Sequence, residues 1–414
     1  MPLTSAPSIN RKVKRRRFLQ NTLLTTGSLL LSRWPSLAAA PVETLSPDLA
    51  KNWLSRWEQH IVGETNHRYC DTETGEELAW LLSPFLDGFY YGYKATNNAH
   101  WVERLVDWVD AWIARAVKEP DGYVGWPKAG TGGALAKEFF TDSLLGEAMA
   151  FRPVVLMAGE IQRDPELKAR FGDQASRYLK LAGETFEKWI ARGCWREING
   201  GGVWVVPAFG IDQQTGKWTE GYAQRHTEGL SHPDNKQNHI ARWLMALYDV
   251  SHKPVYQETA RKWWQIMKSR MHTREGGKYC VWNYWEPAGP WDYNPDGTTR
   301  HWVGVHPNGG YYQIDIEGIV CAFKHELVFS KTDIDRLVAT NRDFMWNQQL
   351  HGARFGRIDG GETDARWKES AGTLWTALVP YDETLRKIFL ANNDPASWSG
   401  LIATPWFLAE AKRS

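Results

Sequence analysis

The sequence has 414 residues, with 49 Lys and Arg, 48 Asp and Glu, and 24 Trp. Residues 1–40 hold seven of the basic residues and no acid, which leaves 42 basic and 48 acidic residues in the rest of the chain. This balance excludes nucleic acid as an expected partner, because proteins that bind it carry an excess of Lys and Arg on one face. An acidic polysaccharide could bind only at a locally positive site.

Residues 1–40 are expected to be a twin-arginine signal peptide. The segment 14–20 reads KRRRFLQ, with the twin pair at Arg15 and Arg16, and it precedes an apolar run at 23–31 and three alanines at 38–40. The apolar run is much shorter than the roughly 20 residues that a membrane span needs. We therefore expect a periplasmic or secreted protein with no stable membrane association once the signal is removed.

Proteins exported by this route fold in a reducing cytoplasm, so disulfides are not expected. The cysteines Cys70, Cys194, Cys280 and Cys321 lie far apart, with no spacing typical of zinc ligands. They are expected to be small buried side chains, and the sequence suggests neither a metal nor another cofactor.

Residues 41–414 are expected to form one all-α catalytic domain. Apolar residues recur three and four positions apart, for example at Trp101, Leu105, Trp108 and Trp112. Between such stretches lie aromatic, Gly-rich loops at 121–126, 200–207, 276–282 and 351–357, a spacing of roughly 75 to 80 residues that indicates a repeated unit. The pattern predicts an α/α toroid, closed or incomplete, of about six or seven helix pairs. Short β-hairpins near 203–206 and 278–284 are expected in its rim loops.

The 24 Trp residues favour a carbohydrate ligand, because flat aromatic faces stack on sugar rings. Most of them are expected to pack between the two helix layers. Trp126 and Trp204 belong to Gly-rich loops, so these two are expected to contact the substrate.

The densest polar cluster spans 224–243, and a helix is predicted from Asp234, its expected N-cap, to about Tyr248. Four polar side chains three or four residues apart are predicted to share one face of that helix: Asn235, Asn238, His239 and Arg242. Such a set suits β-elimination in a uronic-acid polymer. An amide and a guanidinium bind the carboxylate, and a neutral His removes the neighbouring proton.

The Asn238-His239 pair resembles that of the alginate and other uronic-acid lyases with an α/α toroid, and the layout looks like polysaccharide lyase family 38. The resemblance implies that Asn238 neutralises the carboxylate and that His239 is the base. From the loops that follow, Tyr311 is predicted as the acid and Arg300 as a carboxylate clamp. The further residues expected to bind substrate are His226, Arg242, Tyr284, His301 and Tyr312, together with Trp126 and Trp204.

Two other functions fit the same sequence. A glycoside hydrolase would need two carboxylates about 5 Å or about 6.5–9.5 Å apart, and Glu138, Asp142, Asp315 and Glu317 are candidates. Asp142 is better explained as a helix cap, and Asp315 and Glu317 lie two residues apart in a predicted helix, so they cannot share a face. A non-catalytic carbohydrate-binding protein would explain the Trp residues without any proton-transfer set.

Overall fold

The computed structural model describes residues 45–129, 139–207, 209–212, 215–220, 229–363, 368 and 370–412. The predicted signal peptide lies outside these ranges. The α-helices are α1 (Pro47–Glu64), α2 (Tyr69–Thr72), α3 (Ser83–Thr96), α4 (Ala99–Ala114), α5 (Leu144–Arg163), α6 (Pro165–Ala191), α7 (Asp234–Ser251), α8 (Pro254–Arg270), α9 (Gly310–Lys324), α10 (Lys331–Ala339), α11 (Glu383–Asn392) and α12 (Gly400–Ala411). Shorter helical turns include η2 (Leu78–Leu82), η6 (Thr340–Met345) and η7 (Thr376–Tyr381).

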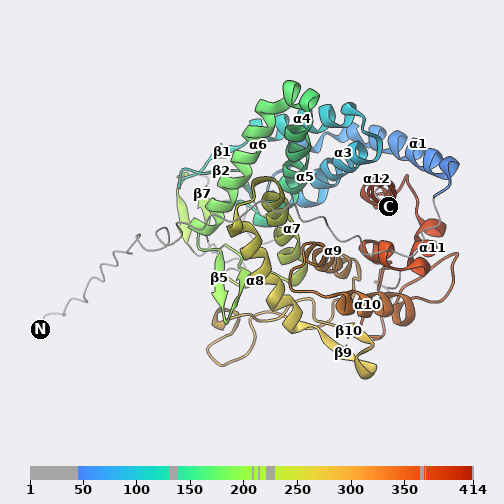
Figure 1. Cartoon of the computed structure of the whole chain (residues 1–414). Coiled ribbons are helices and arrows are strands. Elements are labelled where there is room, and N and C mark those ends of the chain that lie inside the picture. Colours follow the sequence, from blue (N-terminus) through green and yellow to red (C-terminus); the bar gives the residue numbers. More distant parts are fainter. Residues whose placement is uncertain are drawn as a thin grey trace, which may run out of the picture. The chain divides into compact units, whose positions relative to one another are not determined.

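The helices form two concentric rings within the unit Pro41–Ser414 (Figure 1). Elements α3, α5, α7, α9 and η7 follow one another round the inside, each packed against the next. Helix α12 packs against both α3 and α1, so the last helix meets the first. Helices α4, α6, α8, α10 and α11 lie outside and pack on the inner elements. The α/α toroid predicted from the sequence is confirmed.

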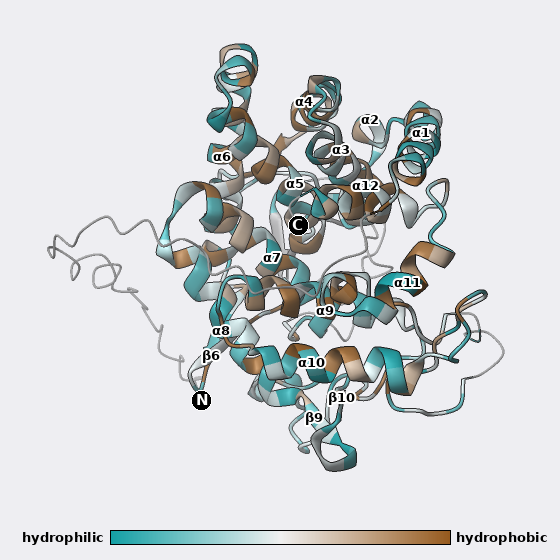
Figure 2. Ribbon diagram, turned by 45° about the vertical axis from the view of Figure 1, so that its right-hand side comes forward, coloured by the Kyte–Doolittle hydropathy of each residue, from teal (hydrophilic) through white to brown (hydrophobic). Residues whose placement is uncertain are grey.

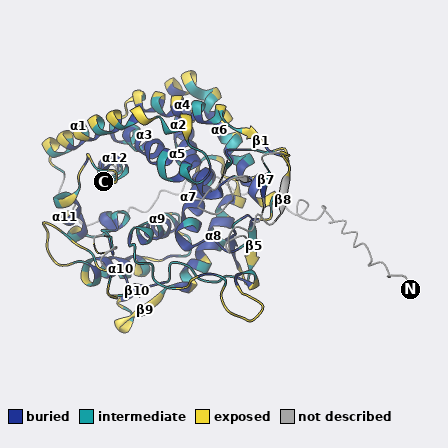
Figure 3. Cartoon of the chain, turned by 180° about the vertical axis from the view of Figure 1, so that it is seen from behind, coloured by how far each residue is buried: buried dark blue, intermediate teal, exposed yellow. Residues whose placement is uncertain are grey.

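Burial follows this two-layer plan. On the outer helix α4, Trp101, Leu105, Trp108 and Trp112 are all buried, which matches their predicted helical spacing. Figure 3 shows exposed residues along the outer helices and buried residues on α5 and α7. The hydropathy colours of Figure 2 agree, with polar residues along the outward side of α1 and α6. Most Trp residues therefore serve the packing between the layers, as expected.

The strands are short and belong to the loops at one end of the helix pairs. They are β1 (Val117–Lys118), β2 (Val124–Gly125), β3 (Lys128–Ala129), β4 (Phe139–Thr141), β5 (Trp195–Ile198), β6 (Gly201–Trp204), β7 (Phe209–Asp212), β8 (Trp218–Glu220), β9 (His272–Arg274) and β10 (Tyr279–Val281). The pairs β1-β2, β5-β6 and β9-β10 are antiparallel, and β3-β4-β7-β8 form a four-stranded sheet. The pairs β5-β6 and β9-β10 are the hairpins expected near 203–206 and 278–284.

A buried ion network joins these loops to the outer layer. Lys188 of α6 is fully buried, and its Nζ donates to Asp142 (2.7 Å), Glu147 (2.6 Å) and the carbonyl of Val124 (3.0 Å). The cap of α5 is Ser143, whose Oγ accepts from the Gly146 amide, so Asp142 is an ion-pair partner and not the cap. Burial raises the pKa of Glu147 to about 7.

Cys70, Cys194 and Cys280 are buried, Cys321 is half-buried, and all four are free thiols. Within the described ranges, the structure contains no helix with the length and apolar character needed to cross a bilayer.

Candidate functional site

Two ion pairs lie on the inner face of the ring. Arg152 of α5 donates to Asp87 of α3 (2.6 Å) and to the hydroxyl of Tyr91 (2.9 Å). Arg242 of α7 pairs with Glu317 of α9. Burial raises the pKa of Asp87, while Arg152 and Arg242 oppose that rise and Glu317 adds to it. Helices α3 and α9 are not adjacent in the ring, so side chains that interact between them face its inside.

His239 belongs to the same inner face and is 8% exposed. Its ring meets Trp80 edge to face, with centroids 6.3 Å apart. Its Nε2 has no hydrogen-bond partner among the described residues. Burial, and then the charges of Arg242 and Arg152, lower its pKa well below the ordinary value, so the imidazole is neutral. Trp80 lies on η2, a π-helical turn of the kind often found at functional sites.

Asn238 does not join His239 on the inner face. Its Oδ1 accepts from the indoles of Trp263 and Trp264 on the outer helix α8, both at 3.0 Å. Its Nδ2 donates to Asp315 of α9 at 2.8 Å, and the side chain is fully buried. Because both ends of the amide are occupied within the protein, Asn238 and His239 do not form the predicted carboxylate-binding pair.

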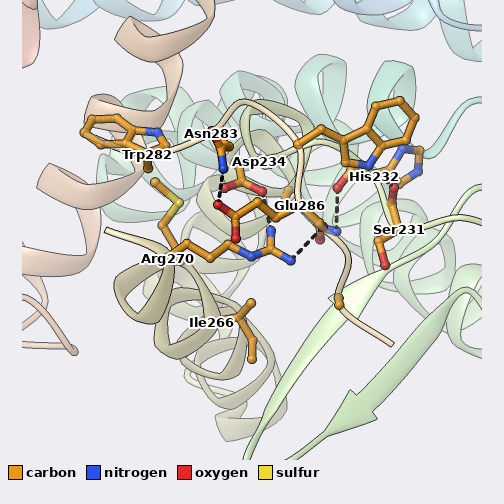
Figure 4. Close-up of polar contacts among 12 residues, drawn as sticks. Ser231, His232, Asp234, Ile266, Arg270, Trp282, Asn283 and Glu286 are labelled. Atoms are coloured by element: carbon orange, nitrogen blue, oxygen red, sulfur yellow. Dashed lines mark hydrogen bonds and ion pairs between the residues drawn. The ribbon is translucent and has the colours of Figure 1, made fainter. Parts of the chain in front are cut away.

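The start of α7 is fixed by a further buried ion pair (Figure 4). Asp234 is the first residue of the helix and pairs with Arg270 at the end of α8, while the N-cap is Pro233. Asp234 is therefore not the predicted cap. Arg270 also donates to the carbonyl of Glu286 at 3.0 Å. Burial raises the pKa of Asp234 to about 7. These contacts hold α7, and with it His239, against the loop that follows β10.

Half-buried aromatic rings lie at the start of α7 and α9. The rings of Tyr284, His306 and Tyr311 are mutually in contact, with centroid distances of 4.7–5.0 Å. Burial, followed by Tyr311, Asp315 and Glu76, raises the pKa of Tyr284. We call Tyr284, His306 and Tyr311 the rim trio. It includes two of the predicted site residues, Tyr284 and Tyr311.

The other predicted aromatic contacts lie in the core. Trp126 is 1% exposed and stacks on Trp112, to whose carbonyl its indole donates at 2.9 Å. Trp204 is also 1% exposed. Tyr312 is 1% exposed, and its hydroxyl accepts from the amide of His306. Because the hairpins and loops fold back onto the helices, these three side chains are covered by protein.

The remaining predicted residues lie away from the ion pairs of the inner face. Arg300 donates to the carbonyl of Trp291 at 2.8 Å. His301 is buried and stacks on Trp285, with centroids 4.1 Å apart. His226 lies outside the described residues. Arg300 and His301 thus contact Trp291 and Trp285, whereas His239 contacts Trp80 on the inner face.

Of the candidate carboxylates for a hydrolase, only Glu317 is on the inner face. Asp315 points the other way and accepts from Asn238 and from the indole of Trp282 (2.9 Å), as expected for residues two apart in a helix. Asp142 belongs to the Lys188 network, and Glu138 lies outside the described residues.

Sequence reasoning missed Trp80, Asp87 and Arg152. A usable signal was present, because Asp87 and Arg152 are charges with apolar neighbours on both sides, in the segments 85–91 and 149–155, and a charge in such a place is rarely buried without a partner. Among the described residues, no group of three or more His, Cys, Asp or Glu side chains is placed to hold a metal ion.

The sequence matches no protein-family model and no curated protein. Solved structures of similar fold include an α-1,6-mannanase from Salegentibacter sp. HEL1_6 in complex with α-1,6-mannotriose (10% identity, TM-score 0.47), covering 89% of this chain and 99% of that one. A cellobiose 2-epimerase from Spirochaeta thermophila (12%, 0.48) covers 88% and 86%. A D-mannose isomerase (15%, 0.47) covers 88% and 87%. At these identities the likeness concerns the fold alone.

The resemblance to polysaccharide lyases predicted from the sequence is wrong, and so is the predicted β-elimination. The three similar structures are of a glycoside hydrolase, an epimerase and an isomerase, and none of these is a lyase. The residue pair that carried the resemblance is also not assembled, since Asn238 is bound to Trp263, Trp264 and Asp315.

Proposed function

We propose that this chain is an enzyme that converts a carbohydrate by proton transfer on the inner face of the ring, with His239 as the base. One observation carries the proposal. The imidazole is buried and neutral, and its Nε2 has no partner. Leaving such a nitrogen unpaired costs about 1–3 kcal/mol, and a perturbed, unpaired group of this kind favours a functional role over a structural one.

The charges around His239 favour a neutral saccharide. Arg152 and Arg242 are paired with Asp87 and Glu317, and Lys236, one turn before His239, donates to Glu76 at 2.8 Å. Because each of these cations already has a carboxylate partner, they supply no net positive charge for an acidic polymer. Trp80 and the rim trio provide aromatic faces for the C–H surfaces of a sugar.

The reaction class that fits a neutral base beside guanidinium groups is isomerisation or epimerisation of a reducing sugar. His239 would take the proton from the carbon next to the carbonyl of the open-chain sugar. A guanidinium N–H of Arg242 or Arg152 that its carboxylate partner does not use would donate to the oxygen that becomes negative in the enediolate. The imidazolium exchanges its proton with solvent and then returns one, to the neighbouring carbon in isomerisation or to the opposite face of the same carbon, after the enediolate has turned over, in epimerisation. In isomerisation a hydroxyl proton also moves between the two enediol oxygens, so no other reactant is consumed.

Glycoside hydrolysis is the second candidate, because two carboxylates, Asp87 and Glu317, face the inside of the ring. One of them must carry a proton to serve as the acid, and burial raises the pKa of Asp87. Water would then add across the glycosidic bond. This reaction shortens the saccharide, whereas isomerisation or epimerisation leaves its length unchanged.

The test is incubation of the protein with glucose, mannose, cellobiose and α-1,6-mannotriose in deuterated water, followed by NMR. Deuterium on the carbon next to the carbonyl, without shortening, identifies isomerisation or epimerisation. New reducing ends without that label identify hydrolysis. His239→Ala should lower kcat at least a hundredfold, in line with the loss of a general base.

His351→Ala is the matched control, because His351 is exposed on a turn. It should keep full activity. If His239→Ala keeps its fold by circular dichroism and also keeps wild-type kcat, the proposed base is wrong.

We also propose that the protein works outside the cytoplasm. The support is the KRRRFLQ segment with its short apolar run.

A further inference from the structure

Trp302 differs from most Trp residues of this protein because it is exposed. At 51%, it is the most exposed large apolar side chain in the described part of the chain. Its indole folds over Gly304, where a Cβ would lie 2.6 Å from the indole Cζ2. The carbonyl of Gly304 accepts from the amide of Tyr284 at 2.8 Å. The loop that carries Trp302 is therefore attached by its backbone to the rim trio.

The aromatic side chains continue from Trp302 toward the inner face. The Trp302 ring meets His306 edge to face at 6.2 Å, and His306 contacts Tyr284 and Tyr311. Tyr284 is joined to the start of α7, because its carbonyl accepts from the amide of Asp234 at 3.1 Å.

On the same helix Lys236 pairs with Glu76, one turn before His239. A row of partly exposed rings thus leads from the surface to the start of α7, the helix that carries the proposed base.

We infer that Trp302 is an outer sugar-binding subsite, so that the substrate is an oligosaccharide with at least one unit beyond the unit that reacts. This inference rests on the proposed function. An exposed indole held in place by its own loop offers a flat apolar face at little entropic cost. Arg357 lies beside the same loop, where its guanidinium donates to the Val305 carbonyl (3.4 Å) and to Asp359 (2.7 Å). These polar groups are placed to meet the hydroxyls at the edge of a stacked sugar.

The experiment is calorimetric titration of wild type and Trp302→Ala with two length series, glucose to cellopentaose and mannose to α-1,6-mannopentaose. The titrations are repeated in a His239→Gln background, so that turnover does not change the ligand. Wild type should bind longer members more tightly. Trp302→Ala should bind the longest members about tenfold more weakly and the monosaccharide equally well.

Trp398→Ala is the matched control. Trp398 is 46% exposed before α12, where it contacts Phe85, and it is not part of the row. The inference is overturned if wild type shows no dependence on length, if Trp302→Ala weakens binding equally at all lengths or not at all, or if Trp398→Ala has the same effect. Failure of the proposed function is seen separately, as full kcat on the shortest substrate in His239→Ala.

Discussion

Replacing Asn238 by Ala should destabilise the protein strongly, because its amide joins three elements of the two layers. The change removes the two hydrogen bonds that Oδ1 accepts from the indoles of Trp263 and Trp264, and the one that Nδ2 donates to Asp315. At about 1 kcal/mol for each buried hydrogen bond, the three bonds amount to about 3 kcal/mol. The partners left behind are Trp263, Trp264 and Asp315, all in the interior, so water does not replace the lost bonds freely.

Urea titration followed by far-ultraviolet circular dichroism measures this change in the free energy of unfolding. The expected loss of about 3 kcal/mol corresponds to a fall in Tm of about 4 °C for a domain of this size. His239→Ala is the informative comparison, because it removes a neighbour that lacks a partner at Nε2. The cavity that it leaves costs stability, but removal of the unpaired Nε2 offsets part of that cost, so the loss should be smaller than for Asn238→Ala while activity is lost. An Asn238→Ala protein with wild-type stability but no activity would refute this reasoning.

Two further predictions concern other parts of the chain. His325 at the end of α9 donates to Asp249 at 2.9 Å. Burial alone would lower the pKa of His325, but the hydrogen bond to Asp249 contributes to raising that pKa to about 11. The charged His325 stabilises the fold by about 1 kcal/mol, fully below pH 6.5 and progressively less as the pH rises toward 11. In urea titrations, the difference in unfolding free energy between wild type and His325→Gln should therefore shrink from pH 6 to pH 10. A difference that grows over this range would contradict the assignment. Changing both Arg15 and Arg16 to Lys should leave the protein in the cytoplasm on fractionation and immunoblotting, whereas Arg33→Lys should not; export of the double variant would refute the signal.

The fold could be predicted because helix packing repeats a local pattern. The spacing of Trp101, Leu105, Trp108 and Trp112 identifies one buried stripe on an outer helix, and similar stripes recur along the chain. The site could not be predicted as well, because its side chains come from α3, α5, α7 and α9. No spacing within one helix says that Asp87 meets Arg152.

The predicted helix after Pro233 exists, but the direction of its side chains was only partly right. Helical spacing places Asn238, His239 and Arg242 within one broad face. One part of such a face on an inner helix of a toroid points into the ring. The other part packs against neighbouring helices, including those of the outer layer. His239 and Arg242 fall on the inner part, and Asn238 falls on the part that meets α8 and α9.

The loop aromatics illustrate a second limit. Trp126 and Trp204 belong to Gly-rich loops just as an exposed ligand-binding Trp would, yet both are buried. The local sequence does not reveal whether a hairpin folds back on the helices or stands away from them. Trp302 shows the opposite outcome in a loop with similar composition.

The contact of α12 with α1 and α3 makes the ring dependent on its two ends. The buried indole of Trp57 in α1 donates to the carbonyl of Leu401 in α12 at 3.0 Å, so helices separated by more than three hundred residues share one hydrogen bond. A nascent chain cannot make this contact until α12 has left the ribosome. Until then the side of α3 that α12 covers is open, so closure of the ring is a late step of folding.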